Sequence, residues 1–236
     1  MSPLLAIIIG IALLIPAIAI AVPVHEMGHA AAAYLLGDRS VRYYGYFTID
    51  PRRFLDPVGT LAIFLGLVGW GRRVPTQSNR INTTGKKILY ELGGPAANLL
   101  VAIVVGQAVR AMLLGGLHLS LDVVTGLLFG VVFVIVFLNL SLFAFNLLPI
   151  PGLDGWNIIE ALLKSRFPRF FFEVHVRQRE IWAGIVLILV LFSFFNRVNL
   201  LNPIMSPFFQ PASLISIGAC LPYGVPYINF LFPCLL

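Results

Sequence analysis

The chain has 236 residues, of which 59% are hydrophobic and only 11% are charged, and its mean hydropathy is +0.94. Soluble domains carry charge on about a quarter of their residues, so this composition excludes an ordinary soluble domain and indicates an integral membrane protein. The net charge of +6 is then expected to gather on one side of a lipid bilayer, with no nucleic acid as partner.

The first apolar segment covers residues 4–36. As a helix it would be about 50 Å long, which exceeds a hydrocarbon core of about 30 Å, and Pro16 and Pro23 are expected kink points. The segment nevertheless contains HEMGH at 25–29, although ionisable groups are costly there and mark a functional site. In H-E-x-x-H on a helix, both histidines share one face and can bind a single zinc ion.

The following segments differ in polarity and length. Residues 38–56 are polar and alternate at 41–49, which predicts a small strand or β-hairpin. Residues 57–71 are apolar but too short to span comfortably, so we expect a re-entrant element or a short buried helix. Further spans are expected at about 88–114, 119–148 and 181–201. We therefore predict an all-α polytopic membrane protein with about four full transmembrane helices, a short re-entrant element and a small β-hairpin.

The carboxyl-terminal tail differs from the rest of the chain. We expect one intramembrane core over residues 1–203 and an apolar, proline-rich tail of unassigned role over 204–236. This tail contains no Asp, Glu, Lys or Arg. Its five prolines argue against one continuous spanning helix. The sequence assigns no role to its cysteines, Cys220 and Cys234.

Basic residues gather in three loops. Residues 37–56, 72–87 and 149–180 hold four, five and five of the sixteen Lys and Arg residues. Cytoplasmic loops are enriched in these residues, so we expect all three loops on the cytoplasmic side, most simply of the plasma (inner) membrane. This topology brings the end of the first helix and the turn at 149–155 to the same membrane face, and the site is then expected near the cytoplasmic side.

A catalytic zinc usually has three protein ligands, so the two histidines need a partner. Asp154 is the best candidate because it lies in NLLPIPGLDG at 146–155, where prolines and glycines break an apolar span. On sequence alone this carboxylate is either a metal ligand or the cap of a helix over 155–163. Glu91 and Asp122 are alternative third ligands.

Two motifs together, HEMGH and NLLPIPGLDG, resemble those of the site-2 protease family of intramembrane zinc metalloproteases, in its compact bacterial and archaeal branch. Shorter pieces support the resemblance: LGD at 36–38, DPVGT at 56–60, GWGRRVP at 69–75 and GGPAAN at 93–98. Arg72-Arg73 stand where lysine or proline is more usual in the family. The resemblance implies one Zn²⁺ per chain with the ligands His25, His29 and Asp154, Glu26 as general base, and Asn146 and Asn98 near the scissile peptide.

The function implied is that of a zinc-dependent endopeptidase that hydrolyses a peptide bond in or near a transmembrane segment of a membrane-protein substrate. The partners are then that substrate and the lipid bilayer; the oligomeric state stays open. Three alternatives use the same polar cluster: a metal-ion transporter, a membrane metallopeptidase with a glutamate ligand in place of Asp154, and an inactive protein that binds membrane clients. The retained Glu26 argues against the last of these.

Overall fold

The structure is a computed structural model. It describes residues 3–48, 50–57, 59–60, 71–77, 79–116, 122–178, 180–182, 184–185, 188 and 201–218. The elements in this part of the chain are helical. In chain order they are α1 (Pro3–Leu35), α2 (Ser40–Tyr43), the 3-10 helix η1 (Pro51–Arg53), α4 (Thr84–Leu114), α5 (Val123–Asn146), α6 (Asp154–Leu163), α7 (Pro168–Val176) and α9 (Leu201–Ile217).

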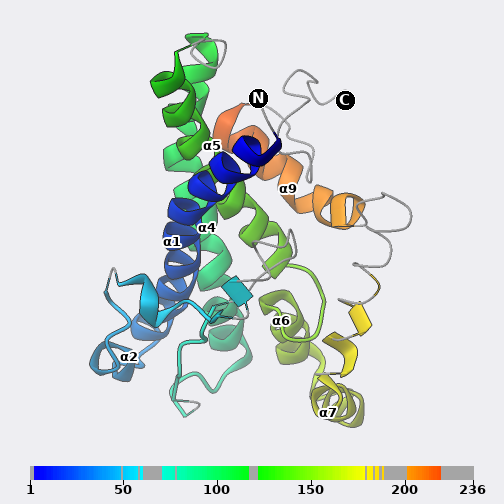
Figure 1. The fold of residues 1–236 in the computed structure, drawn as a ribbon. Coiled ribbons are helices and arrows are strands. Elements are labelled where there is room, and N and C mark those ends of the chain that lie inside the picture. The colour runs from blue at the N-terminus through cyan, green and yellow to red at the C-terminus, as the bar shows by residue number, and fades with distance from the viewer. Residues whose placement is uncertain are drawn as a thin grey trace.

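Three long helices, α1, α4 and α5, pack against one another and form the body of the protein (Figure 1). Each contains a stretch long and apolar enough to cross a membrane: Ile8–Leu35, Thr84–Leu114 and Val123–Asn146. Two of the helices begin at a capping side chain, because Thr83 accepts the backbone N–H of Lys86 and Asp122 accepts that of Thr125. The three helices make the chain an integral membrane protein, as its composition predicts.

Helices α1 and α4 approach closely at two glycines. A Cβ atom on Gly93 would lie 2.6 Å from the backbone oxygen of Gly28, and a Cβ atom on Gly28 would contact the backbone oxygen of Gly93. Membrane helices associate through such small residues because lipid supplies no hydrophobic driving force between them. Gly28 belongs to HEMGH, so this contact fixes the distance between the motif and α4.

Helix α9 covers the opposite side of the α4–α5 pair. Its buried residues Met205 and Phe209 belong to the same apolar core as Val136 and Leu140 of α5, and the rings of Phe137 and Phe209 meet edge to face. The 17-residue helix contains two prolines and begins at Leu201. It therefore crosses the predicted boundary at residue 203, and the division of the chain at that point stays a prediction.

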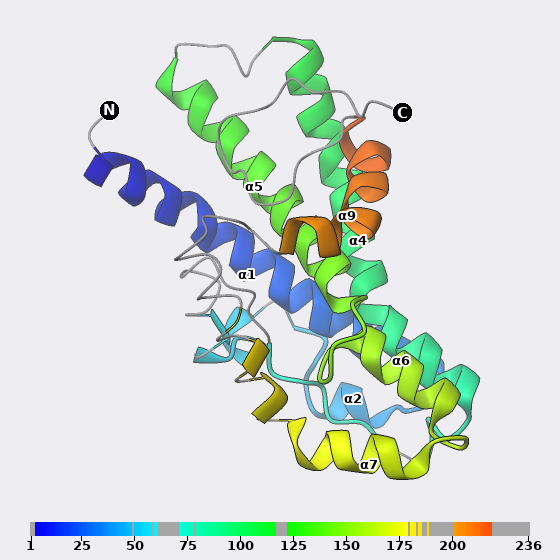
Figure 2. The same ribbon diagram turned by 90° about the vertical axis from the view of Figure 1, so that its right-hand side faces the viewer.

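The polar segments gather at one end of the helix bundle. Figures 1 and 2 place α2, α6 and α7 at the end where α1 and α5 finish and α4 begins, away from the start of α1. Figure 2 shows α7 running beneath α6. The first helix and the turn after α5 therefore reach the same end of the bundle, which is the arrangement that the basic loops predict.

The predicted β-hairpin at 41–49 is wrong. Ser40–Tyr43 forms the short helix α2, and Gly45 follows in a left-handed turn with φ of 71°. Val41 is completely buried, and the Arg53 guanidinium donates hydrogen bonds to the carbonyls of Tyr44 and Gly45. These contacts satisfy the backbone locally, so the alternating sequence finds no partner strand in the described residues, where the bridge between Leu55 and Gly71 is isolated.

The predicted number of about four full spans is also not supported. The described residues contain three helices that could cross a membrane. The predicted span at 181–201 and the re-entrant element at 57–71 fall mostly outside the described residues.

Asp38 ties the end of α1 to the neighbouring loops. It is completely buried, and its carboxylate accepts hydrogen bonds from the backbone N–H and hydroxyl of Ser40 and from the backbone N–H of Gln77 at 2.7 Å. Burial disfavours the ionised form, but these hydrogen bonds outweigh it and lower the pKa of Asp38 below its usual range. Folding therefore gains stability from this group only while the group is ionised.

We predict that Asp38→Asn lowers the free energy of unfolding by about 2 kcal/mol at neutral pH, because hydrogen bonds to a charged acceptor are lost. A lowered pKa stabilises the folded state above the unfolded-state value of about 3.9, and this stabilisation is lost as the pH falls through the lower folded-state value. Thermal unfolding in detergent, followed by circular dichroism, should show a difference from wild type that shrinks in acid. Asp50→Asn, at an exposed cap, is the control. A difference independent of pH would contradict the prediction.

Candidate metal site between helices α1 and α6

His25 and His29 lie on one face of α1, as their four-residue spacing predicts. Their side chains are buried, with 7% and 5% of each residue exposed. The rings meet edge to face with centroids 4.8 Å apart, and the two Nε2 atoms are separated by 3.2 Å. Both rings therefore present the same nitrogen to one point beside the helix.

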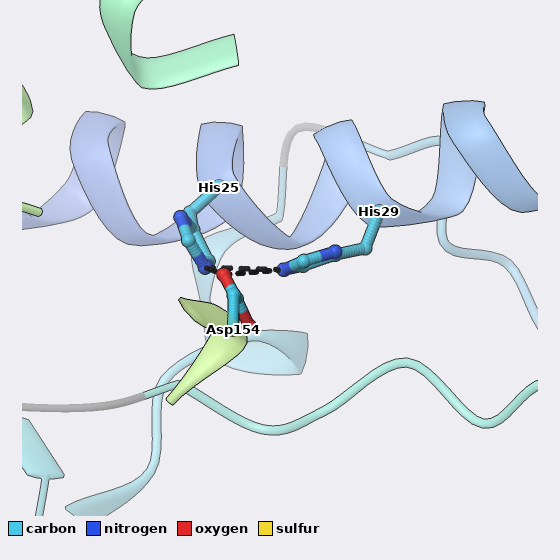
Figure 3. A group of neighbouring side chains, drawn as sticks. All are labelled: His25, His29 and Asp154. Atoms are coloured by element: carbon cyan, nitrogen blue, oxygen red, sulfur yellow. Dashed lines mark hydrogen bonds and ion pairs between the residues drawn. The ribbon is translucent and has the colours of Figure 1, made fainter. Parts of the chain in front are cut away.

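Asp154 completes this group from the other side (Figure 3). It is the first residue of α6, and its Oδ2 atom lies 3.2 Å from the Nε2 atom of His25 and 3.3 Å from that of His29. The residue preceding α6 is Leu153, and the start of the helix has no side-chain cap. Of the two readings that the sequence left open for Asp154, the geometry therefore favours a role in the histidine site over a helix cap.

The turn before α6 is tight, and it aims Asp154 at α1. Gly152 adopts a φ of 98°, which favours glycine. A Cβ atom on Gly155 would contact the backbone of Leu147 and lie 2.7 Å from the oxygen of Leu148. Arg73 donates a hydrogen bond of 3.1 Å to the carbonyl of Gly152 and lies 4.0 Å from Asp154 Oδ1. Gly152 thus permits the left-handed turn, and Gly155 permits the close backbone packing.

The outer nitrogens of the two rings are both held by acceptors. His29 Nδ1 lies 2.9 Å from the backbone carbonyl of Tyr90, which can only accept a hydrogen bond. His25 Nδ1 lies 2.7 Å from Asn98 Oδ1. In a neutral imidazole, a proton on Nδ1 leaves a lone pair on Nε2. Both lone pairs therefore face Asp154.

The two Nε2 atoms and Asp154 Oδ2 therefore converge as three acceptors. None of them carries a hydrogen, so they cannot bond to one another unless a proton or a metal ion is added. The ionised carboxylate is the form of aspartate that binds metals. Two imidazole nitrogens and one carboxylate oxygen are a donor set that suits zinc, so these residues fit a metal ion.

Gly94 of α4 leaves the space that this group needs. A Cβ atom at this position would contact His29 Nε2 and lie 2.7 Å from His25 Nε2. The histidine pair can therefore lie directly against α4 because residue 94 has no side chain.

Glu26 is buried beside the histidines, with 4% of the residue exposed. Its Oε2 atom has no hydrogen-bond partner among the described residues. Gly71 lies against the other carboxylate oxygen, because a Cβ atom on that glycine would be 2.8 Å from Oε1. Burying a carboxylate oxygen without a hydrogen-bond partner costs free energy, which favours a functional role for Glu26.

The other predicted site residues are placed differently. Asn98 contacts His25, whereas the Asn146 amide donates to Leu142 of its own helix and is not among the residues that meet at Asp154. Of the alternative ligands, Glu91 accepts a hydrogen bond from Asn157, and Asp122 caps α5. Asp154 is therefore the carboxylate that the structure brings to the histidines.

Three residues near the site were not predicted to have a role there: Tyr90, Arg73 and Asn139. Tyr90 contributes through its backbone, which no side-chain motif reveals. Asn139 lies seven residues before Asn146 in the same apolar span, and a polar residue in such a setting could have marked it.

A cavity of about 260 Å³ lies beside the site, between the loop at Arg73 and helices α6 and α7. Arg73 lines it and also approaches Asp154, so the cavity adjoins the carboxylate side of the site. Its other lining residues include Trp156, Phe171 and His175. The lining thus combines aromatic and polar side chains.

The fold and this site define a helical membrane protein with a buried group of two histidines and one aspartate suited to a metal ion. The model of peptidase family M50 matches residues 120–193, which include α5 and the turn that carries Asp154. Together with the curated relatives below, this match confirms the predicted resemblance to the site-2 protease family.

The curated relatives below are all named as zinc metalloproteases. The chain is 36% identical over 142 residues to the Bacillus subtilis protein named "Putative zinc metalloprotease YwhC", and the aligned region covers 59% of this chain and 64% of that protein. It is 36% identical to "Putative zinc metalloprotease Rip2" of Mycobacterium tuberculosis and 34% identical to that of Mycolicibacterium smegmatis. Each of these two matches covers 61% of this chain and 55% of the relative. No solved structure gives a significant match.

We predict that Gly94→Ala removes most of the metal bound by the purified protein, at least about tenfold, because the added methyl group occupies the space beside both Nε2 atoms. Gly85→Ala is the matched control: it lies in the same helix, and a Cβ atom there meets nothing within 4 Å. Metal content per chain, measured by mass spectrometry, checks the prediction. Equal metal in the two variants would contradict it.

Proposed function

We propose that the protein is a zinc-dependent intramembrane endopeptidase. In this proposal His25, His29 and Asp154 hold the zinc ion, and Glu26 is the general base. The observation that carries the proposal is the buried convergence of His25 Nε2, His29 Nε2 and Asp154 Oδ2 within a membrane-spanning bundle. The match to peptidase family M50 supports it independently.

Zinc bound at such a site acts as a Lewis acid that polarises a peptide carbonyl and makes a bound water more acidic. Glu26 follows His25 directly on α1, and its free Oε2 atom is available to accept a proton from water and pass it to the leaving amine. The burial of the three ligands keeps bulk water away from them. In hydrolysis Glu26 therefore accepts one proton and later donates it.

The substrate in this proposal is a transmembrane segment of another membrane protein. His29 lies six residues before the end of α1, about 9 Å at 1.5 Å per residue, so the site is inside the bilayer but close to one face. The loops at that end are rich in Lys and Arg, which supports placing it on the cytoplasmic side of the plasma membrane.

The cavity beside Arg73 offers space for the part of the substrate that leaves the membrane. It adjoins Asp154 and lies on the side of α6 and α7, where the polar loops gather. In our proposal, the substrate chain therefore passes from the bilayer over the three ligands and into this cavity. Such a path lets a peptide extend on both sides of the bond that is cut.

The first test is the metal content of the detergent-purified protein, compared with His25→Ala and Asp154→Ala. We expect about one zinc per chain in the wild type and a loss in both variants, because removing one of three ligands weakens the site strongly. Glu160→Ala, which removes a partly buried carboxylate of α6 that pairs with Lys164, should keep its zinc. Zinc retained in Asp154→Ala would place the third ligand elsewhere.

The second test separates catalysis from metal binding. We predict that Glu26→Gln keeps its zinc but loses peptide hydrolysis by at least about a hundredfold, because the amide cannot accept the proton. Quantitative proteomics of membranes from cells that express wild type or Glu26→Gln would identify fragments made only by the wild type. Fragments that appear equally with both proteins would refute the role of Glu26.

A further inference from the structure

Asn139 of α5 is completely buried and is connected to the metal site through side-chain hydrogen bonds. The Asn98 amide donates to its Oδ1 atom at 2.8 Å, and Asn98 Oδ1 faces His25 Nδ1 at 2.7 Å. The amide of Asn139 in turn donates to the carbonyl of Ile135 at 2.8 Å. A chain of hydrogen bonds therefore joins α1, α4 and α5 at one level of the bundle.

Two backbone carbonyls fix the donor-to-acceptor direction of this series of hydrogen bonds. The amide group of Asn98 also donates to the carbonyl of Ala21 at 2.9 Å. Because a carbonyl cannot donate, the Asn98 atom that faces it must be nitrogen, and the atom that faces His25 must be oxygen. The carbonyl of Ile135 orients Asn139 in the same way and leaves its oxygen toward Asn98.

His25 must then be the donor to Asn98, with its proton on Nδ1. All three bonds run in the same direction, from His25 to Asn98, from Asn98 to Asn139 and from Asn139 to Ile135. Hydrogen bonds in such a series polarise and strengthen one another, most of all at low dielectric. Asn139 accepts the second amide proton of Asn98, which would otherwise be buried without a partner.

The two histidines differ in what holds them. His29 donates directly to a backbone carbonyl, which no substitution removes. His25 depends on the side chains of Asn98 and, through it, Asn139. A single substitution on α5 can consequently change the tautomer of His25, whereas the tautomer of His29 is held by a backbone carbonyl.

We propose that Asn139 is a positioning residue: through Asn98 it holds His25 in the tautomer with the proton on Nδ1, so that the Nε2 lone pair faces His29 and Asp154. Groups that orient a metal-binding histidine typically change metal affinity 10- to 100-fold when removed. The expected effect on zinc rests on the proposed function, whereas the tautomer of His25 does not.

The experiment compares Asn139→Leu with wild type, with Asn98→Ala and with the double variant. Ser141→Ala is the matched control, because Ser141 lies on the same helix, is buried, and bonds only locally to the carbonyl of Phe137 at 2.8 Å in the contacts described. Asn139→Ala replaces Asn139→Leu if the larger side chain prevents folding, as judged by circular dichroism. Two readouts are measured on each protein.

The first readout is the tautomer of His25 in the metal-free protein, from nitrogen NMR of labelled histidine at a pH where the imidazoles are neutral. The His25 signal is identified by its loss in His25→Gln. We expect the proton on Nδ1 in wild type and Ser141→Ala, and a mixture of both tautomers in Asn98→Ala. In Asn139→Leu the Ala21 carbonyl alone orients the Asn98 amide, so we expect a smaller but measurable fraction of the second tautomer. An unchanged tautomer in Asn139→Leu would overturn the proposal.

The second readout is zinc affinity, measured by competition with a chelator. Asn98→Ala should weaken binding 10- to 100-fold, Asn139→Leu about tenfold, and the double variant no more than Asn98→Ala alone, because coupled residues are not additive. Fully additive losses would mean that Asn139 acts by packing, and would overturn the proposal. If the wild type binds no zinc, the proposed function fails and the tautomer alone decides the role of Asn139.

Discussion

The structure depends on one electrostatic constraint: three acceptor atoms are buried together inside a membrane-spanning bundle. His25 Nε2, His29 Nε2 and Asp154 Oδ2 approach within about 3.3 Å of one another. Their lone pairs repel unless a cation lies among them, and the surrounding apolar medium screens that repulsion far less than water does. Much of the local architecture can be understood as the means of holding these atoms in place.

The helix packing meets this constraint with small residues and backbone carbonyls. Gly28 and Gly93 let α1 and α4 approach until Tyr90 O can accept a hydrogen bond from His29. Gly94, one residue further, lets both rings lie directly against α4. The glycines of the GGP sequence therefore serve close contact more than flexibility. The polar amides of Asn98 and Asn139 complete the arrangement without placing a charge in the core.

Much of the fold and of the site follows from local patterns in the sequence. Hydropathy predicts the long helices, and the four-residue spacing of His25 and His29 predicts their shared face. The meeting with Asp154 depends on tertiary structure 125 residues further along the chain. The broken apolar span at 146–155, the distribution of basic loops and the resemblance to a family suggested it. The roles assigned to Glu26 and to the three ligands stay predictions until they are measured.

The errors have physical causes that single-sequence reasoning does not see. Alternation at 41–49 predicts a strand, but Arg53 binds backbone carbonyls within that segment and Asp38 binds the backbone just before it. These contacts stabilise turns instead. The amide of Asn146 bonds within its own helix, and the predicted place of this residue near the scissile peptide stays a prediction. Asn139 resembles an ordinary interhelical contact in sequence, and only its partner, Asn98, connects it to the site.

The distribution of the site along the chain has a consequence for biosynthesis. At roughly 5–20 residues per second, the ribosome adds Asp154 about 6 to 25 seconds after His29. During this interval the newly inserted α1 carries two histidines in the membrane without their carboxylate. Asn98 is made earlier than Asp154, so a nascent α1–α4 pair can already bring the first hydrogen-bond partner to His25. The order of synthesis thus places this partner beside the ring before the residue that completes the site exists.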